Sequence, residues 1–113
     1  MKSNSVAFTN LANFVNPKTG FSIATQIGKR FGNVVTIRLL IESSNKPLSH
    51  DSNIAIAQLH SQLKPVTTVF CSIVMSDSFG WIDEDGTVYV RLSSADANNG
   101  LIPWLNATML ITG

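Results

Sequence analysis

The stretch WIDEDGTVYVRL, residues 81–92, places three carboxylates, Asp83, Glu84 and Asp85, directly before a glycine. Clustered carboxylates can bind calcium, but a calcium loop needs about six to eight oxygen ligands spread through a longer turn. They can also act as an acid–base pair, but a general acid needs burial to raise its pKa. Asp-Gly between alternating apolar residues is instead a strong β-hairpin signal. The cluster therefore predicts a solvent-exposed turn, with no metal and no catalytic residue.

The register of this hairpin follows if Asp85 and Gly86 form a two-residue type I′ loop. Trp81 then faces Val90 across the hairpin. One face carries a coherent apolar set that we assign to the core: Phe79, Trp81, Val88, Val90 and Leu92. The opposite face presents Ile82, Tyr89 and Arg91, which we expect to contact another subunit or partner protein.

The sequence contains few other residues that could bind a metal or act in catalysis. The two histidines, His50 and His60, have no carboxylate or cysteine at ligand spacing, and the single cysteine, Cys71, lies in the apolar run VFCSIVM and is predicted to be a buried, inert thiol. No G-x-S-x-G, Gly-rich phosphate loop or H-E-x-x-H is present in the sequence. We therefore expect no enzymatic activity, no cofactor and no required metal.

Saccharide binding calls for a different kind of residue, because amphipathic indole rings stack on sugar faces. Of the two tryptophans, the hairpin register assigns Trp81 to the core, which leaves Trp104. The loops LSHDSN and DANNGLIPW add polar donors and acceptors. The candidate saccharide-binding residues are Trp104, His50, Asp51, Asn98 and Asn99.

The elements that position these residues are predicted strands, because apolar residues recur with period two. Three segments each bury one face: Phe21, Ile23 and Ile27; Val35, Ile37, Leu39 and Ile41; Leu105, Ala107, Met109 and Ile111. The segment 66–75 is apolar on both faces and predicts a central, doubly covered strand. Residues 53–63 fit either a helix or a strand followed by a loop, and the all-β context favours the strand. Strands separated by turn clusters predict a single antiparallel β-sandwich, jelly-roll-like, over residues 1–113.

Composition limits the partners. The chain has 113 residues, of which 13% are charged, and a formal net charge of +1. Nucleic-acid and membrane-surface binding need clustered Lys and Arg, so we expect neither. The amino-terminal residues lack the continuous apolar region of a secretion signal, and no apolar run approaches the length of a membrane span.

The order of segments across residues 32–112 resembles a known family. GNVVTIRLLI, NIAIAQL…LKPV, GWIDEDGTVYVRL and LNATMLI follow one another as in small β-sandwich domains of tail-fibre, baseplate and receptor-binding proteins of siphophages that infect Gram-positive bacteria. The chain departs from the family pattern at His60, Lys64 and Met109, where proline, arginine and tyrosine are usual.

This resemblance implies a virion protein of the tail or baseplate, made in the host cytoplasm. Its implied partners are other phage tail proteins, host cell-wall saccharide, or both, and its implied assembly is a homotrimer, with a monomer possible for the isolated chain. Two functions stay open: recognition of host saccharide, or a structural adaptor that binds another tail protein without saccharide. The resemblance to receptor-binding domains favours the first.

Overall fold

The computed structural model describes residues 9–44, 48–49, 52–74 and 76–111. They form β1 (Thr9–Leu11), β2 (Val15–Pro17), β3 (Phe21–Phe31), β4 (Val34–Ser43), β5 (Asn53–Leu59), a 3₁₀ turn η1 (Ser61–Leu63), β6 (Val69–Ile73), β7 (Phe79–Ile82), β8 (Thr87–Arg91), α1 (Ser94–Asn99) and β9 (Leu101–Leu110). The strands dominate, and the predicted all-β class is confirmed.

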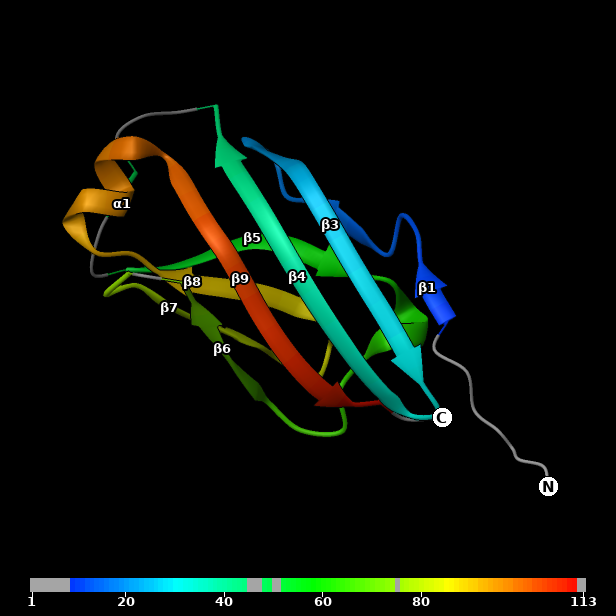
Figure 1. The fold of residues 1–113 in the computed structure, drawn as a ribbon. Helices are drawn as coiled ribbons and strands as arrows, with labels where there is room; N and C mark the ends of the chain where they lie inside the picture. Colours follow the sequence, from blue (N-terminus) through cyan, green and yellow to red (C-terminus); the bar gives the residue numbers. More distant parts are fainter. Residues whose placement is uncertain (1–8, 45–47, 50–51, 75, 112–113) are drawn as a thin grey trace, which may run out of the picture.

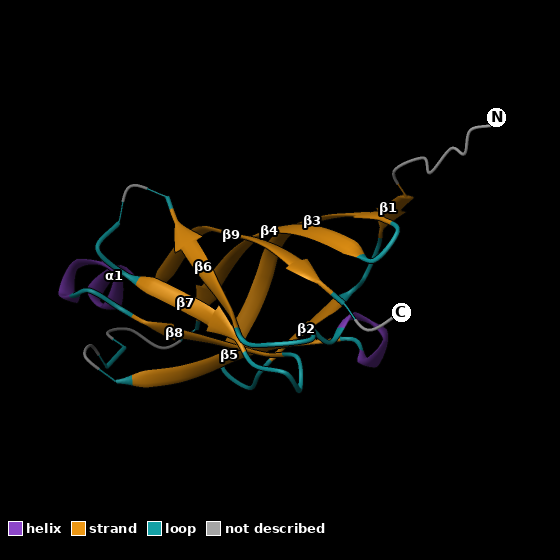
Figure 2. Ribbon diagram, turned by 90° about the horizontal axis from the view of Figure 1, so that it is seen from below, coloured by secondary structure: helices purple, strands orange, loops and turns teal. Residues whose placement is uncertain are grey.

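The nine strands form one antiparallel sheet in the order β1-β3-β4-β9-β6-β7-β8-β5-β2. Strand β6 is its corner, because residues 69–71 pair with β7 whereas Ser72 and Ile73 pair with β9. The sheet curls there into a half-barrel, so that β3, β4 and β9 cross over β5 and β8 (Figure 1), with β6 between the two halves (Figure 2). The strands therefore form one continuous curled sheet. The two separate sheets of the predicted β-sandwich are not confirmed.

The core lies between the two halves of the curled sheet. The sequence alternation in β4 and in residues 105–111 is confirmed, because the residues predicted to face the core are all buried: Val35, Ile37, Leu39, Ile41, Leu105, Ala107, Met109 and Ile111. Strands β5, β7 and β8 contribute Ile56, Ile82, Val88 and Val90 from the other half. Burial of these aliphatic side chains is the main force that holds the fold together.

The predicted core assignments in β3 and β6, like those of Phe79 and Trp81 in β7, are wrong for local reasons. A bulge in β3 inserts one residue between Ile23 and Thr25, so the alternation reverses and Ile27 is 45% exposed opposite Arg38. Strand β6 buries only one face, with Cys71 and Ile73 inward and Phe70 outward. The predicted double cover of residues 66–75 is therefore wrong.

The hairpin between β7 and β8 differs from the predicted type I′ turn by one residue. The loop is three residues long: the Asp83 amide donates to the Thr87 carbonyl at 3.0 Å, and the Gly86 amide donates to the Asp83 carbonyl at 2.8 Å. Trp81 consequently pairs with Tyr89. Because side chains alternate along a strand, a one-residue slip exchanges the two faces of β7 while leaving those of β8 unchanged.

The two segments whose secondary structure was hardest to predict are residues 53–63 and the loop before β9. Residues 53–59 form β5 and 61–63 a single 3₁₀ turn, as the strand interpretation predicted. The predicted loop DANNGLIPW, residues 96–104, is instead the end of the helix α1 followed by the start of β9. The Ser93 hydroxyl accepts from the Asp96 amide at the start of α1, and Gly100 ends the helix in a left-handed conformation. No helix in the described ranges is long and apolar enough to cross a membrane.

Candidate ligand-binding site

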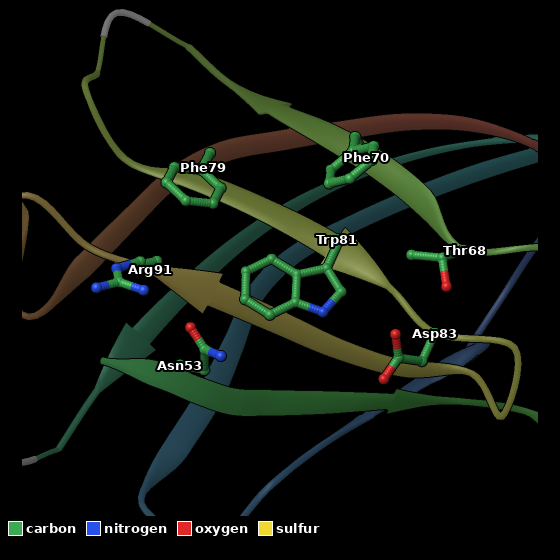
Figure 3. A pocket seen from close by; sticks show the side chains of 7 residues that line it. All are labelled: Asn53, Thr68, Phe70, Phe79, Trp81, Asp83 and Arg91. Carbon is green, nitrogen blue, oxygen red and sulfur yellow. The ribbon is translucent and has the colours of Figure 1, made fainter. Parts of the chain in front are cut away.

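An open pocket of about 360 Å³ lies on the outer face of the half-sheet that contains β6, β7 and β8. Three aromatic residues line it, Phe70, Phe79 and Trp81, together with four polar residues, Asn53, Thr68, Asp83 and Arg91 (Figure 3). We call this group the aromatic pocket.

Strand pairing brings the rings together. Phe70 of β6 pairs with Trp81 of β7, and Trp81 pairs with Tyr89 of β8, so three neighbouring strands place aromatic side chains in one row. The Trp81 and Tyr89 rings stack, with centroids 5.5 Å apart and planes at 14°. Phe79 lies two residues from Trp81, with its ring centroid 6.0 Å away. Since Tyr89 covers one face of the indole, a ligand can stack only on the other face.

These rings are unusually exposed for a hydrophobic cluster. The side chain of Phe70 is 78% exposed and that of Phe79 is 47% exposed. The inward positions beside them are already filled by Cys71, Ile82 and Val90, so the fold cannot bury the rings in its own core. Exposed apolar groups that lie together and are bordered by polar residues are typical of binding sites.

The polar residues lie at the two ends of the aromatic pocket. Arg91 pairs with Phe79 on one side and with Asn53 on the other, which puts a guanidinium beside an amide. Asp83 and Thr68 lie toward the opposite end (Figure 3). None of these four side chains forms a hydrogen bond or ion pair with another residue in the described part of the chain. Their donors and acceptors are therefore available to a ligand.

A polar network holds the loop that leads into β7. One carboxylate oxygen of Asp96 in α1 accepts hydrogen bonds from the hydroxyls of Ser76 and Ser78. The buried Ser78 hydroxyl also accepts from the Ser93 amide at 2.8 Å. These bonds connect the start of α1 to the residue immediately before Phe79, and so they help to position the Phe79 ring.

Of the three carboxylates of the hairpin, that of Asp85 has a structural role. The Asp85 side chain accepts from the Thr87 amide at 2.9 Å, and this bond lowers the pKa of the Asp85 carboxyl below its ordinary value. Among residues that the structure describes, no three His, Cys, Asp or Glu side chains gather as a metal site would require. Burial raises the pKa of the Cys71 thiol to about 12, so this thiol is neutral at physiological pH.

The three predicted saccharide-binding residues that the structure describes, Trp104, Asn98 and Asn99, do not line the aromatic pocket. Trp104 is half-buried in β9, where the Arg38 guanidinium stacks over its ring at 4.7 Å. Asn98 and Asn99 are exposed in α1. His50 and Asp51 fall outside the described residues.

The predicted contact residues divide between core and surface. Ile82 is fully buried, so its assignment to an outward contact patch is wrong, and the cause is the slip in the hairpin register. Tyr89 and Arg91 do lie on the outward face.

Sequence reasoning missed Trp81, Phe70, Phe79 and Asn53 as binding residues. Residue type favours Trp81 as a stacking ring, but the predicted two-residue loop assigns it to the core, and that loop length is wrong. A glycine as the last residue of DEDG also fits a three-residue loop, and the aliphatic Ile82 suits a closed core better than the larger Trp81. These two signals together could have favoured the observed register.

No protein-family model matches this sequence, and no curated protein is significantly similar to it.

Proposed function

We propose that this chain is a saccharide-binding module of a bacteriophage tail or baseplate, carried in the virion, that recognises host cell-wall saccharide through the aromatic pocket. The observation that carries the proposal is the open face of Trp81, supported beneath by Tyr89 and flanked by Phe70 and Phe79. The phage context comes from the resemblance of segments 32–112 alone.

The chemistry of the pocket suits a sugar. The apolar C–H face of a pyranose stacks on an indole, while its hydroxyls need donors and acceptors around the ring. Asn53, Thr68 and Asp83 supply amide, hydroxyl and carboxylate groups that are not used within the described structure. A fixed ring also costs little conformational entropy on binding.

The test is a pull-down of labelled protein onto purified host cell walls. Phe70→Ala is the most informative variant, because a side chain that is 78% exposed contributes little to the core. We expect Phe70→Ala to weaken wall binding about tenfold, in line with the loss of one aromatic contact of about 1–3 kcal/mol. Trp81→Ala should reduce binding further, since it removes the stacking surface itself.

Leu110→Ala is the matched control, because Leu110 is also an exposed apolar strand residue, at 53%, and lies on β9 away from the pocket. It should bind walls like the wild type. Equal wall binding by wild type, Phe70→Ala and Trp81→Ala would contradict the proposal, as would no binding by any correctly folded form.

A structural adaptor is the second candidate. The exposure of Phe70 and Phe79 also suits the apolar centre of a protein–protein contact. In that case the same variants would lose binding to another tail protein in a co-purification experiment, while no form would bind cell walls. The saccharide function is favoured because unpaired polar groups border the rings closely at both ends.

A further inference from the structure

The two ends of the aromatic pocket carry opposite charges. Asp83 follows β7 directly and lies at the end near the hairpin turn, whereas Arg91 closes β8 and lies at the other end (Figure 3). The Trp81 ring lies between them (Figure 3). Trp81 is two residues before Asp83, so the two side chains share one face of the hairpin. A ligand that spans the pocket therefore meets a carboxylate at one end and a guanidinium at the other.

The space between these charges is suited to a cation. Phe70, Phe79 and Trp81 border the same open volume, and the negative faces of aromatic rings attract ammonium groups, quaternary ammonium most typically. The Asp83 carboxylate adds to this attraction. Stacking against Tyr89 holds the indole so that its free face stays open to the pocket.

The Arg91 end is suited to an anion. The guanidinium is exposed and has no ion-pair partner within the described residues, and the Asn53 amide lies across the strand pair from it. The planar guanidinium fork matches the oxygens of a phosphate or carboxylate. A purely cationic ligand would be repelled by Arg91, and a purely anionic ligand by Asp83.

We propose that the aromatic pocket binds a zwitterionic substituent of a glycan, with a quaternary ammonium group among the three rings and a phosphate at Arg91. Phosphocholine is the simplest group with this chemistry. The inference rests on the proposed function, in that it takes the zwitterion to be carried by a saccharide. A lipid headgroup carries the same chemistry, and the comparison of phosphatidylcholine vesicles with a phosphocholine-substituted glycan separates the two sources.

The test is calorimetric titration of the whole chain with phosphocholine, choline and glycerol phosphate. We expect phosphocholine to bind at least about tenfold more tightly than either half of the zwitterion, because it engages both ends. Arg91→Gln should reduce phosphocholine affinity to the level of choline while leaving choline binding unchanged or stronger. Asp83→Asn should weaken the binding of choline without weakening the binding of glycerol phosphate.

Arg38→Gln is the matched control, because Arg38 is also an exposed strand arginine and stacks on Trp104 in the other half of the sheet. It should bind all three ligands like the wild type. A loss of phosphocholine binding in Arg38→Gln equal to that in Arg91→Gln would overturn the assignment of the phosphate to Arg91.

The inference and the proposed function fail in different ways. If wall saccharides without a zwitterion bind as tightly as phosphocholine-bearing ones, the inference is wrong and saccharide recognition stands. If phosphocholine binds through Arg91 and Trp81 but no wall polymer does, the zwitterion site stands and wall recognition fails. If phosphatidylcholine vesicles bind while a phosphocholine-substituted glycan does not, the glycan source is overturned.

Discussion

At the residue scale, Gly86 closes the loop whose length determines on which side of the sheet Trp81 lies. Its φ of +86° allows the three-residue loop that pairs Trp81 with Tyr89, whereas a two-residue loop would turn the indole toward the core. A side chain at position 86 would be strained by that φ and would also meet the Gln58 amide nitrogen at 3.1 Å. One glycine therefore links the turn to the exposure of the candidate binding ring.

We expect Gly86→Val to reduce the free energy of unfolding by about 1–2 kcal/mol or more, the cost of a left-handed conformation for an L-residue plus the contact with Gln58. Urea denaturation followed by tryptophan fluorescence measures it. Gly32→Val is the control, because Gly32 also has a positive φ, +61°, with no atom within 4 Å of an added Cβ. Gly32→Val should cost less; an unchanged stability of Gly86→Val would contradict the turn assignment.

At the element scale, the connection between β6 and β7 is held by α1. The Asp96 carboxylate accepts from Ser76 and Ser78, and Ser78 is buried, so the loop has a fixed attachment just before Phe79. Buried hydroxyls that lose their partner cost free energy.

Asp96→Ala should therefore lower the free energy of unfolding by about 1–3 kcal/mol. It should also reduce the binding affinity of any ligand that contacts Phe79. Asp77→Ala is the control, since Asp77 is an exposed acid in the same loop, and it should change stability by less than about 0.5 kcal/mol. Urea denaturation measures the stability of the two variants, and the wall pull-down measures their binding. Equal effects of the two substitutions would show that the network does not hold the loop.

The same scale shows which parts of the fold the sequence can predict. Strict alternation in β4 and in residues 105–111 identifies their buried faces, because the register shift between β4 and β9 lies beyond Leu105, between the pairs Leu39–Leu105 and Ile41–Ile102. The bulge in β3 and the loop of DEDG each add one residue, and period-two patterning has no signal for a one-residue insertion. A two-residue loop places Trp81 in the core and Ile82 outside it, so the sequence does not locate the candidate site, although it identifies tryptophan as the residue type for sugar stacking.

At the scale of the whole molecule, closure of the sheet leaves its two outer faces with different character. The half with β6, β7 and β8 exposes Phe70, Phe79 and Trp81 between charged ends. The half with β4 and β9 pairs its tryptophan with Arg38 instead, so that the indole of Trp104 already has a cation on it. Of the two tryptophans, Trp81 is therefore the better candidate for ligand stacking.

Assembly is the last property at this scale. The resemblance implies a homotrimer in the virion, but the face predicted to form it has lost Ile82 to the core, and Trp81 stacks on Tyr89. Of that predicted patch, Tyr89 and Arg91 stay on the outer face, beside the exposed rings of the aromatic pocket. Stable interfaces bury about 800 Å² per partner, so a self-contact on this face would cover the pocket that we propose to bind saccharide. We expect the isolated chain to be monomeric and a trimer to require a neighbouring tail protein.

Size exclusion coupled to multi-angle light scattering tests this expectation over a wide range of protein concentration. The mass should stay near that of one 12.2 kDa chain, and Tyr89→Ala should not change it. A concentration-independent trimer that dissociates on Tyr89→Ala or Arg91→Glu would show that the outer face of β8 is a subunit interface. The aromatic pocket would then be partly covered in the assembly, and wall binding by the trimer would have to use another surface.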